Sequence, residues 1–139
     1  MKEKHMRFGD YIRKKRLADP RELTMQDVAD QLGFSMSYIS EIENNRKRPF
    51  DGEKLEQLAL FLNLSEYETS LMFDLAGRES RGVPHDIEDT LMYEDVGDLI
   101  RYATRQSKAG FIKEEDWKTF IRDMEVKKQS SQEGSSGDG

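Results

Sequence analysis

The side chains with the greatest capacity for chemistry in this sequence are those that form hydrogen bonds and ion pairs at a surface. The 139 residues include no cysteine, which excludes disulfides, thiolate nucleophiles and the common zinc sites. Two histidines, His5 and His85, are too few to form a metal site alone. Glycine-rich phosphate loops, nucleophile elbows and metalloprotease motifs are also missing. The sequence therefore predicts no enzyme, no cofactor and no metal, and a function carried by a binding surface.

The side chains best placed for such a surface lie between residues 24 and 49. Ser37 offers a hydroxyl that donates and accepts, Glu41 offers an acceptor carboxylate, and Met36 offers an apolar contact. A basic run, Arg46-Lys47-Arg48, follows directly. These residues are the candidates for the binding surface.

Helices must position these residues, because apolar side chains recur three and four residues apart and do not alternate as in strands. The pattern predicts an all-α protein. Thr24 and Ser35 are expected to cap two short helices, which end near Gly33 and Asn45. The complete set of helices expected in the first half is 6–18, 24–32, 36–44, 52–62 and 66–76, the last ending at Gly77.

Composition divides the chain into four parts. A five-helix domain is expected over 1–77, a linker rich in Gly, Ser, Arg and Pro over 78–84, a helical extension over 85–128 and a disordered tail over 129–139. The net charge of −6 is unevenly spread: residues 1–64 carry 12 basic and 11 acidic side chains, and residues 65–139 carry 10 and 17. The acidic excess is therefore downstream of the basic run.

Two short helices separated by a glycine turn, the second capped and polar on one face, form the arrangement that places a helix in the major groove of DNA. The sequence over about residues 7–76 resembles the helix-turn-helix of the Xre/Cro-like phage repressor family. The residues that carry the resemblance are Leu23-Thr24, Val28-Ala29, Leu32-Gly33-Phe34-Ser35, Ile39-Ser40-Glu41-Ile42-Glu43 and Pro49. It implies a five-helix, repressor-like domain that binds double-stranded operator DNA, usually as a homodimer.

The resemblance also assigns the residues that read bases. Met36 and Ser37 match the first exposed positions of the recognition helix, and Glu41 matches the later base-facing position. Chemically, Met36 suits a thymine methyl group, Ser37 suits several bases, and Glu41 accepts from a cytosine amino group. The alternative is that Met36 and Glu41 are merely solvated.

Phosphate contacts fix the position of such a domain and supply most of its salt-sensitive affinity. Gln26 is expected to replace the family's usual glutamine, because Met25 occupies the matching position. A solvated loop is the alternative for the basic run. The full set of expected phosphate ligands is Gln26, Tyr38, Ser40, Asn44, Arg46, Lys47 and Arg48.

Glu43 is assigned a structural role by the resemblance. In the family, the acid that closes the recognition helix pairs with an arginine of the first helix, which maps onto Arg16. We therefore expect an ion pair between Arg16 and Glu43.

The extension is expected to form a helical hairpin over residues 98–128 that buries Trp117 against another surface. Its apolar side chains occur at helical spacing, and we expect them to contact a second copy of the chain, the N-terminal domain or a partner protein. The set of candidate contact residues is Leu99, Phe111, Trp117, Phe120, Ile121 and Met124.

Two functions remain open at this point. The first is a transcriptional repressor that binds an inverted-repeat operator as a dimer. The second is an antitoxin or adaptor whose acidic C-terminal region binds a partner protein, with DNA binding for autoregulation. No apolar run approaches the ~18 to 20 residues that span a bilayer, so the expected location is cytoplasmic, without membrane partners.

Overall fold

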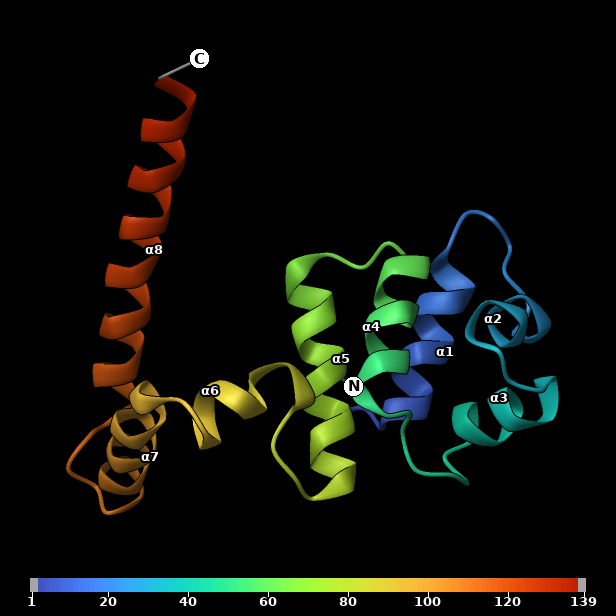
Figure 1. Cartoon of the computed structure of the whole chain (residues 1–139), viewed down its shortest axis with the longest axis horizontal. Helices are drawn as coiled ribbons and strands as arrows, with labels where there is room; N and C mark the ends of the chain where they lie inside the picture. The colour runs from blue at the N-terminus through green and yellow to red at the C-terminus, as the bar shows by residue number, and fades with distance from the viewer. Residues whose placement is uncertain (1–2, 138–139) are drawn as a thin grey trace. The chain divides into compact units, whose positions relative to one another are not determined.

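The computed structural model of the chain describes residues 3–137, and helices are the only regular secondary structure over that range, which confirms the predicted all-α class. The chain divides into two compact units, residues 1–89 and 90–139. None of the described helices is both long enough and apolar enough to cross a lipid bilayer. Figure 1 labels the helices, whose bounds are η1 Glu3–His5, α1 Phe8–Ala18, α2 Met25–Leu32, α3 Met36–Glu43, α4 Gly52–Phe61, α5 Glu66–Ser80, η2 His85–Ile87, α6 Glu88–Met92, α7 Asp95–Lys108 and α8 Glu114–Gly137.

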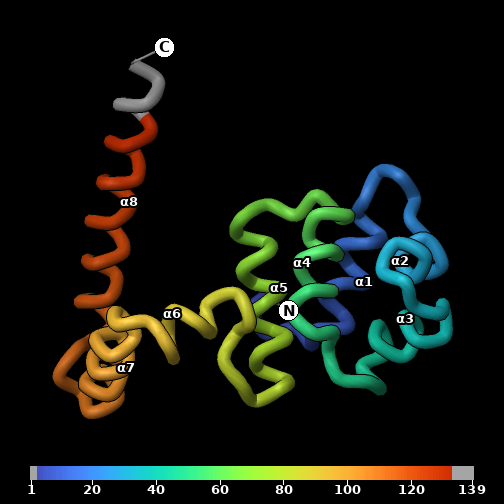
Figure 2. The backbone as a smooth tube through the Cα atoms, in the orientation of Figure 1, coloured from blue at the N-terminus to red at the C-terminus, as the bar shows by residue number. Residues whose placement is uncertain are grey.

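The first unit encloses one hydrophobic core between five helices. Helix α5 packs against α1 and α4, α1 contacts α3, and α2 contacts both α3 and α4. The tube in Figure 2 shows α2 and α3 side by side, away from α5. The largest side chains in this core, all almost fully buried, are Tyr11, Phe8, Leu32, Ile39, Ile42, Leu58, Met72 and Leu75.

Local capping determines where α2 and α3 begin. The Thr24 hydroxyl accepts from the Asp27 amide, while the Asp27 carboxylate accepts from the Thr24 amide at 2.8 Å, which completes a capping box. Ser35 accepts from the Tyr38 amide in the same way at α3. Gly33 adopts φ 77° between the two helices, a conformation that costs glycine little. These signals are readable in the sequence, and both helices begin within a residue of the predicted positions.

The prediction that Gly77 ends the fifth helix is wrong. Helix α5 continues to Ser80 and ends at Arg81, which adopts the left-handed conformation at φ 53°. A Cβ on Gly77 would lie 3.2 Å from the backbone nitrogen of Pro84, so this glycine permits close approach of the following loop. The segment predicted as a linker over 78–84 therefore belongs to the first unit, which extends to residue 89.

The second unit consists of helices α7 and α8 with the end of α6. Gly97 lies against the α6 carbonyls, since an added Cβ would lie 2.6 Å from the oxygens of Thr90 and Leu91. The Trp117 indole donates to the Ser107 hydroxyl at 2.7 Å, which ties the start of α8 to the end of α7.

Beyond that junction α7 and α8 do not pack along their lengths, so the predicted hairpin over 98–128 is not formed. Trp117 is half-buried, while Phe120 and Ile121 on the next turn are exposed. The predicted disordered tail also differs, because α8 continues through residues 129–137. Lys127, Lys128 and Gln129 are good helix formers, so they favour continuation of the helix past Val126, its last apolar residue. Residues 138–139 lie outside the described range.

Replacing Gly9 with alanine should destabilise the first unit, although alanine normally favours a helix by about 1 kcal/mol over glycine. A Cβ at this position would lie 2.2 Å from the Ile42 carbonyl oxygen, in backbone that cannot move aside without shifting α3. We expect a loss of about 1 to 3 kcal/mol in the free energy of unfolding, measured by urea denaturation. Gly82→Ala is the matched control, because its new Cβ would have no neighbour nearer than 4.0 Å. Equal stability of the two variants would contradict the close contact between α1 and α3.

Candidate nucleic-acid interface

The N-terminal turn of α3 presents a rigidly held, exposed edge. Ser35 caps the helix, and Ile39 and Ile42 anchor its opposite face in the core. On the outer face Met36 is 46% exposed and Ser37 is also exposed. Because the cap and the core contacts hold the helix at both ends, these two side chains project from a defined position.

Glu41 lies one helical turn further along α3. Its side chain is 38% exposed, and its carboxylate lies 3.7 Å from the Arg46 guanidinium. At this distance and exposure the pair is weak, so the carboxylate remains able to accept from another donor. Met36, Ser37 and Glu41 thus lie on the accessible part of one short helix.

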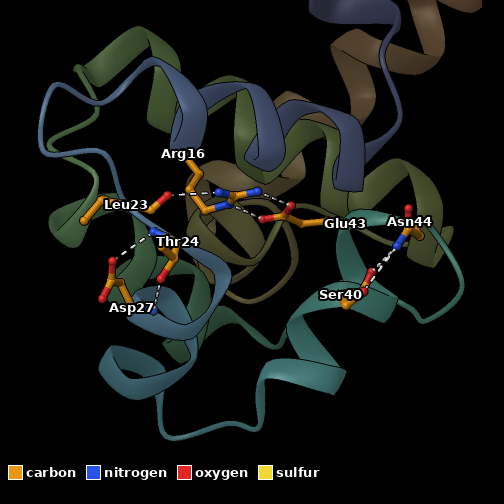
Figure 3. A network of polar contacts seen from close by, with 7 residues as sticks. All are labelled: Arg16, Leu23, Thr24, Asp27, Ser40, Glu43 and Asn44. Carbon is orange, nitrogen blue, oxygen red and sulfur yellow. Dashed lines mark hydrogen bonds and ion pairs between the residues drawn. The ribbon is translucent and has the colours of Figure 1, made fainter.

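A buried ion pair joins α3 to α1. The Arg16 Nε donates to Glu43 Oε2 at 2.8 Å and its Nη2 donates to Oε1 at 2.9 Å, a parallel two-bond arrangement (Figure 3). The remaining Nη1 donates to the Leu23 carbonyl at 2.9 Å, just before the Thr24 cap of α2. The hydrogen bond with Glu43 raises the pKa of Arg16 despite the opposing effect of burial. One guanidinium therefore fixes the relative positions of α1, α3 and the start of α2.

Several side chains expected to bind phosphate are instead engaged within the protein. Gln26 donates to Asp30 Oδ1 at 2.7 Å along α2. The Tyr38 ring packs against Phe34, with 4.7 Å between ring centroids. Asn44 Nδ2 donates to the Ser40 carbonyl at 2.8 Å, as drawn in Figure 3.

These internal contacts differ in how readily a contact with a ligand can replace them. The amides of Gln26 and Asn44 are exposed and retain unused hydrogen-bonding capacity, whereas the Tyr38 ring is held by core packing. Ser40 lies half-buried beside Asn44. The structure therefore places Gln26 and Asn44 at the surface and Tyr38 partly within the aromatic core.

The basic run after α3 is exposed to solvent. Arg46, Lys47 and Arg48 are exposed, and Arg46 makes only the weak contact with Glu41 among the described carboxylates. The next residue but one, Phe50, is buried and stacks on Phe34 with 5.5 Å between centroids. The loop is thus anchored at its far end while its cationic side chains extend into solvent.

Asn45 positions α1 relative to α3. The sequence predicted only that it ends the third helix. It adopts φ 59°, and its Oδ1 accepts from the Gly9 amide at 2.9 Å while its Nδ2 donates to Asp10 at 3.0 Å. The residue that turns the chain out of α3 therefore also caps the first turn of α1. The left-handed preference of asparagine is visible in the sequence, but the contact with Gly9 depends on the fold.

The geometry agrees with a comparison against known families. A family model described as helix-turn-helix matches residues 12–68, which include the Arg16–Glu43 pair, α2 and α3. Searches of curated proteins and of solved structures found no match to the chain.

Removing the buried carboxylate should cost far more stability than removing the exposed one. Glu43→Ala leaves the Arg16 guanidinium buried without its partner, and we expect a loss of about 3 to 5 kcal/mol in the free energy of unfolding. Glu41→Ala removes a carboxylate from the same helix at an exposed site and should cost less than about 1 kcal/mol. Thermal melting followed by circular dichroism compares the two, and equal melting temperatures would contradict a bracing role for the pair.

Proposed function

Through residues 12–68 the chain belongs to the Xre/Cro-like helix-turn-helix family of DNA-binding transcriptional regulators, and on that premise we propose that it is a repressor. The family consists of binding proteins rather than enzymes. It binds an inverted-repeat operator as a homodimer, with one recognition helix in each half-site. The repressor activity follows from the resemblance to phage repressors. Since its DNA partner is there, the proposal places the protein in the cytoplasm.

The observation that carries this proposal is the exposed start of α3 on a braced helix. Met36 and Ser37 project from the first turn, which is the part of a recognition helix that contacts base edges. Glu41 supplies an acceptor one turn later, suited to the amino group of cytosine. The bracing by Arg16 matters because base recognition depends on a defined position of the helix relative to the groove.

Phosphate contacts on either side of α3 supply the remaining affinity. Arg46, Lys47 and Arg48 follow the recognition helix and are exposed, so they serve as the principal phosphate ligands. Gln26 and Asn44 act as secondary ligands that exchange an internal hydrogen bond for one to phosphate. Ser40 and Tyr38 are proposed to bind phosphate through their hydroxyl groups. The Tyr38 ring itself is held in the aromatic cluster.

Selection from a random DNA library followed by footprinting tests this function. Wild-type protein should recover an inverted repeat with half-sites about one helical turn apart (~10 bp). Glu41→Ala should relax the preference at one base pair by about 1 to 3 kcal/mol, whereas Arg48→Ala should weaken binding to all sequences alike and reduce the salt slope by about one. Failure to recover any repeat at low salt would refute specific DNA binding, and an unchanged consensus with Glu41→Ala would refute its base contact. A promoter reporter that is less active with the protein than without it supports repression, and higher activity refutes it.

The proposed dimer contact is the apolar surface of the second unit. Leu99 and Phe111 are 70% and 80% exposed, and Phe120, Ile121 and Met124 lie exposed on successive turns of α8. Trp117 borders this surface and is held by Ser107. A second copy is the favoured occupant because an inverted repeat requires a two-fold partner and two-fold association is the commonest assembly.

Sedimentation of the intact chain tests this surface. Wild-type protein should be a dimer at micromolar concentration, and the double variant Phe120→Asp/Ile121→Asp should be a monomer, because it places two carboxylates in the apolar contact. Leu60→Asp is the matched control, since Leu60 is 79% exposed on the first unit. A monomeric wild type, or a double variant that remains dimeric, would refute the assignment.

The alternative antitoxin or adaptor function rests on the same exposed apolar residues of an acidic region. In that case α8 binds a different protein, and DNA binding serves autoregulation. A monomeric wild type that still binds its operator would favour this second function over the dimeric repressor.

A further inference from the structure

A concave basic surface lies beside the recognition helix and joins three segments of the first unit. It has a volume of about 370 Å³ and is lined by residues before α1, in the α3–α4 loop and at the end of α5. We call it the arginine pocket. Its charged lining residues are Arg7, Arg46, Lys47, Arg48, Arg78, Arg81 and Glu79.

The single carboxylate of the arginine pocket is already occupied. Glu79 Oε1 accepts from Arg7 Nε at 2.6 Å and from the Phe8 amide at 3.2 Å, so it neutralises Arg7 and caps α1. Arg78 donates to the Lys4 carbonyl, which satisfies one hydrogen bond without neutralising its charge. In the part of the chain that the structure describes, no carboxylate pairs with Lys47, Arg48 or Arg81.

This excess of positive charge stands out in a protein with a net charge of −6. Like charges within one concavity repel each other, and an anion between them relieves that repulsion. Several guanidinium groups at one place are suited to a phosphate, because each can donate two parallel hydrogen bonds to its oxygens.

The position of the arginine pocket indicates which phosphate it binds. The loop that carries Arg46 to Arg48 leaves the C-terminal end of α3, and the DNA backbone passes beside a recognition helix that lies in the major groove. Arg81 and Arg78 extend this basic loop onto the end of α5, outside the helix-turn-helix match over 12–68.

We propose that the arginine pocket binds a backbone phosphate of operator DNA beyond the base pairs that α3 reads, with Arg81 as its ligand from α5. The inference rests on the DNA binding proposed above and adds a contact to it. Because the left-handed turn at Arg81 ends α5, the length of that helix determines whether this contact can form.

Substitution of Arg81 in the intact protein tests the contact on the duplex recovered by selection. Arg81→Asn removes the charge and keeps a residue that tolerates the left-handed conformation. It should weaken binding roughly five- to tenfold near 0.1 M salt and lower the slope of log K against log salt by about 0.9, as expected for one phosphate contact. Arg105→Gln is the control, since it removes the same charge from an exposed position on α7. Arg81→Lys should retain the salt slope.

Ethylation interference locates the phosphate directly. With wild-type protein and with Arg105→Gln the same set of ethylated phosphates should block binding, and with Arg81→Asn one of them should cease to do so. Matching affinity, slope and interference pattern in wild type and Arg81→Asn would overturn the proposal while leaving DNA binding intact. If wild-type protein binds no duplex, the proposed function falls as well.

Free phosphate is the other source of the same chemistry, and thermal melting with inorganic pyrophosphate distinguishes it. Stabilisation of wild type but not of Arg81→Asn, together with unchanged DNA binding by Arg81→Asn, would overturn the DNA assignment in favour of a soluble phosphate compound. Loss of DNA affinity in Arg81→Asn, with its melting temperature unchanged, supports the backbone contact.

Discussion

The buried pair between Arg16 and Glu43 is the interaction on which the geometry of the first unit depends. It joins the last turns of α1 and α3, and its third hydrogen bond reaches the Leu23 carbonyl before α2. Burying two charges is costly, and it is tolerated here because both carboxylate oxygens and all three guanidinium nitrogens have partners. The direct consequence is that the orientation of α3, the proposed recognition helix, is set by a neighbouring helix as well as by its own packing.

The sequence predicted the parts of the fold that local signals determine. Thr24, Gly33 and Ser35 act through their own caps and backbone conformations, so α2 and α3 could be placed closely. The end of the fifth helix was wrongly placed at Gly77 because this glycine makes a tertiary contact: it lets the backbone near Pro84 approach α5. No neighbour in the sequence reveals that contact. The boundary between the two units shifted from the predicted linker to residue 89 for the same reason.

The candidate site shows the same division between local and tertiary information. That Met36 and Ser37 lie at the start of a capped helix follows from the Ser35 cap and the helical period. The engagement of Gln26 by Asp30 is an i to i+4 contact that the spacing allowed but did not require. The contact of Asn45 with Gly9 and the arginine pocket could not be found from the sequence, because the first joins residues 36 positions apart and the second joins residues from both ends of the first unit.

The capping of α1 by Glu79 has a consequence for how the protein is made. The Phe8 amide bonds to a side chain 71 residues later, and the Tyr11 hydroxyl donates to the Glu68 carbonyl 57 residues later. During synthesis, residues 68 and 79 must therefore leave the ribosome before the first helix acquires these partners. The helix-turn-helix segment is therefore synthesised before the residues of α5 that cap and bond to α1.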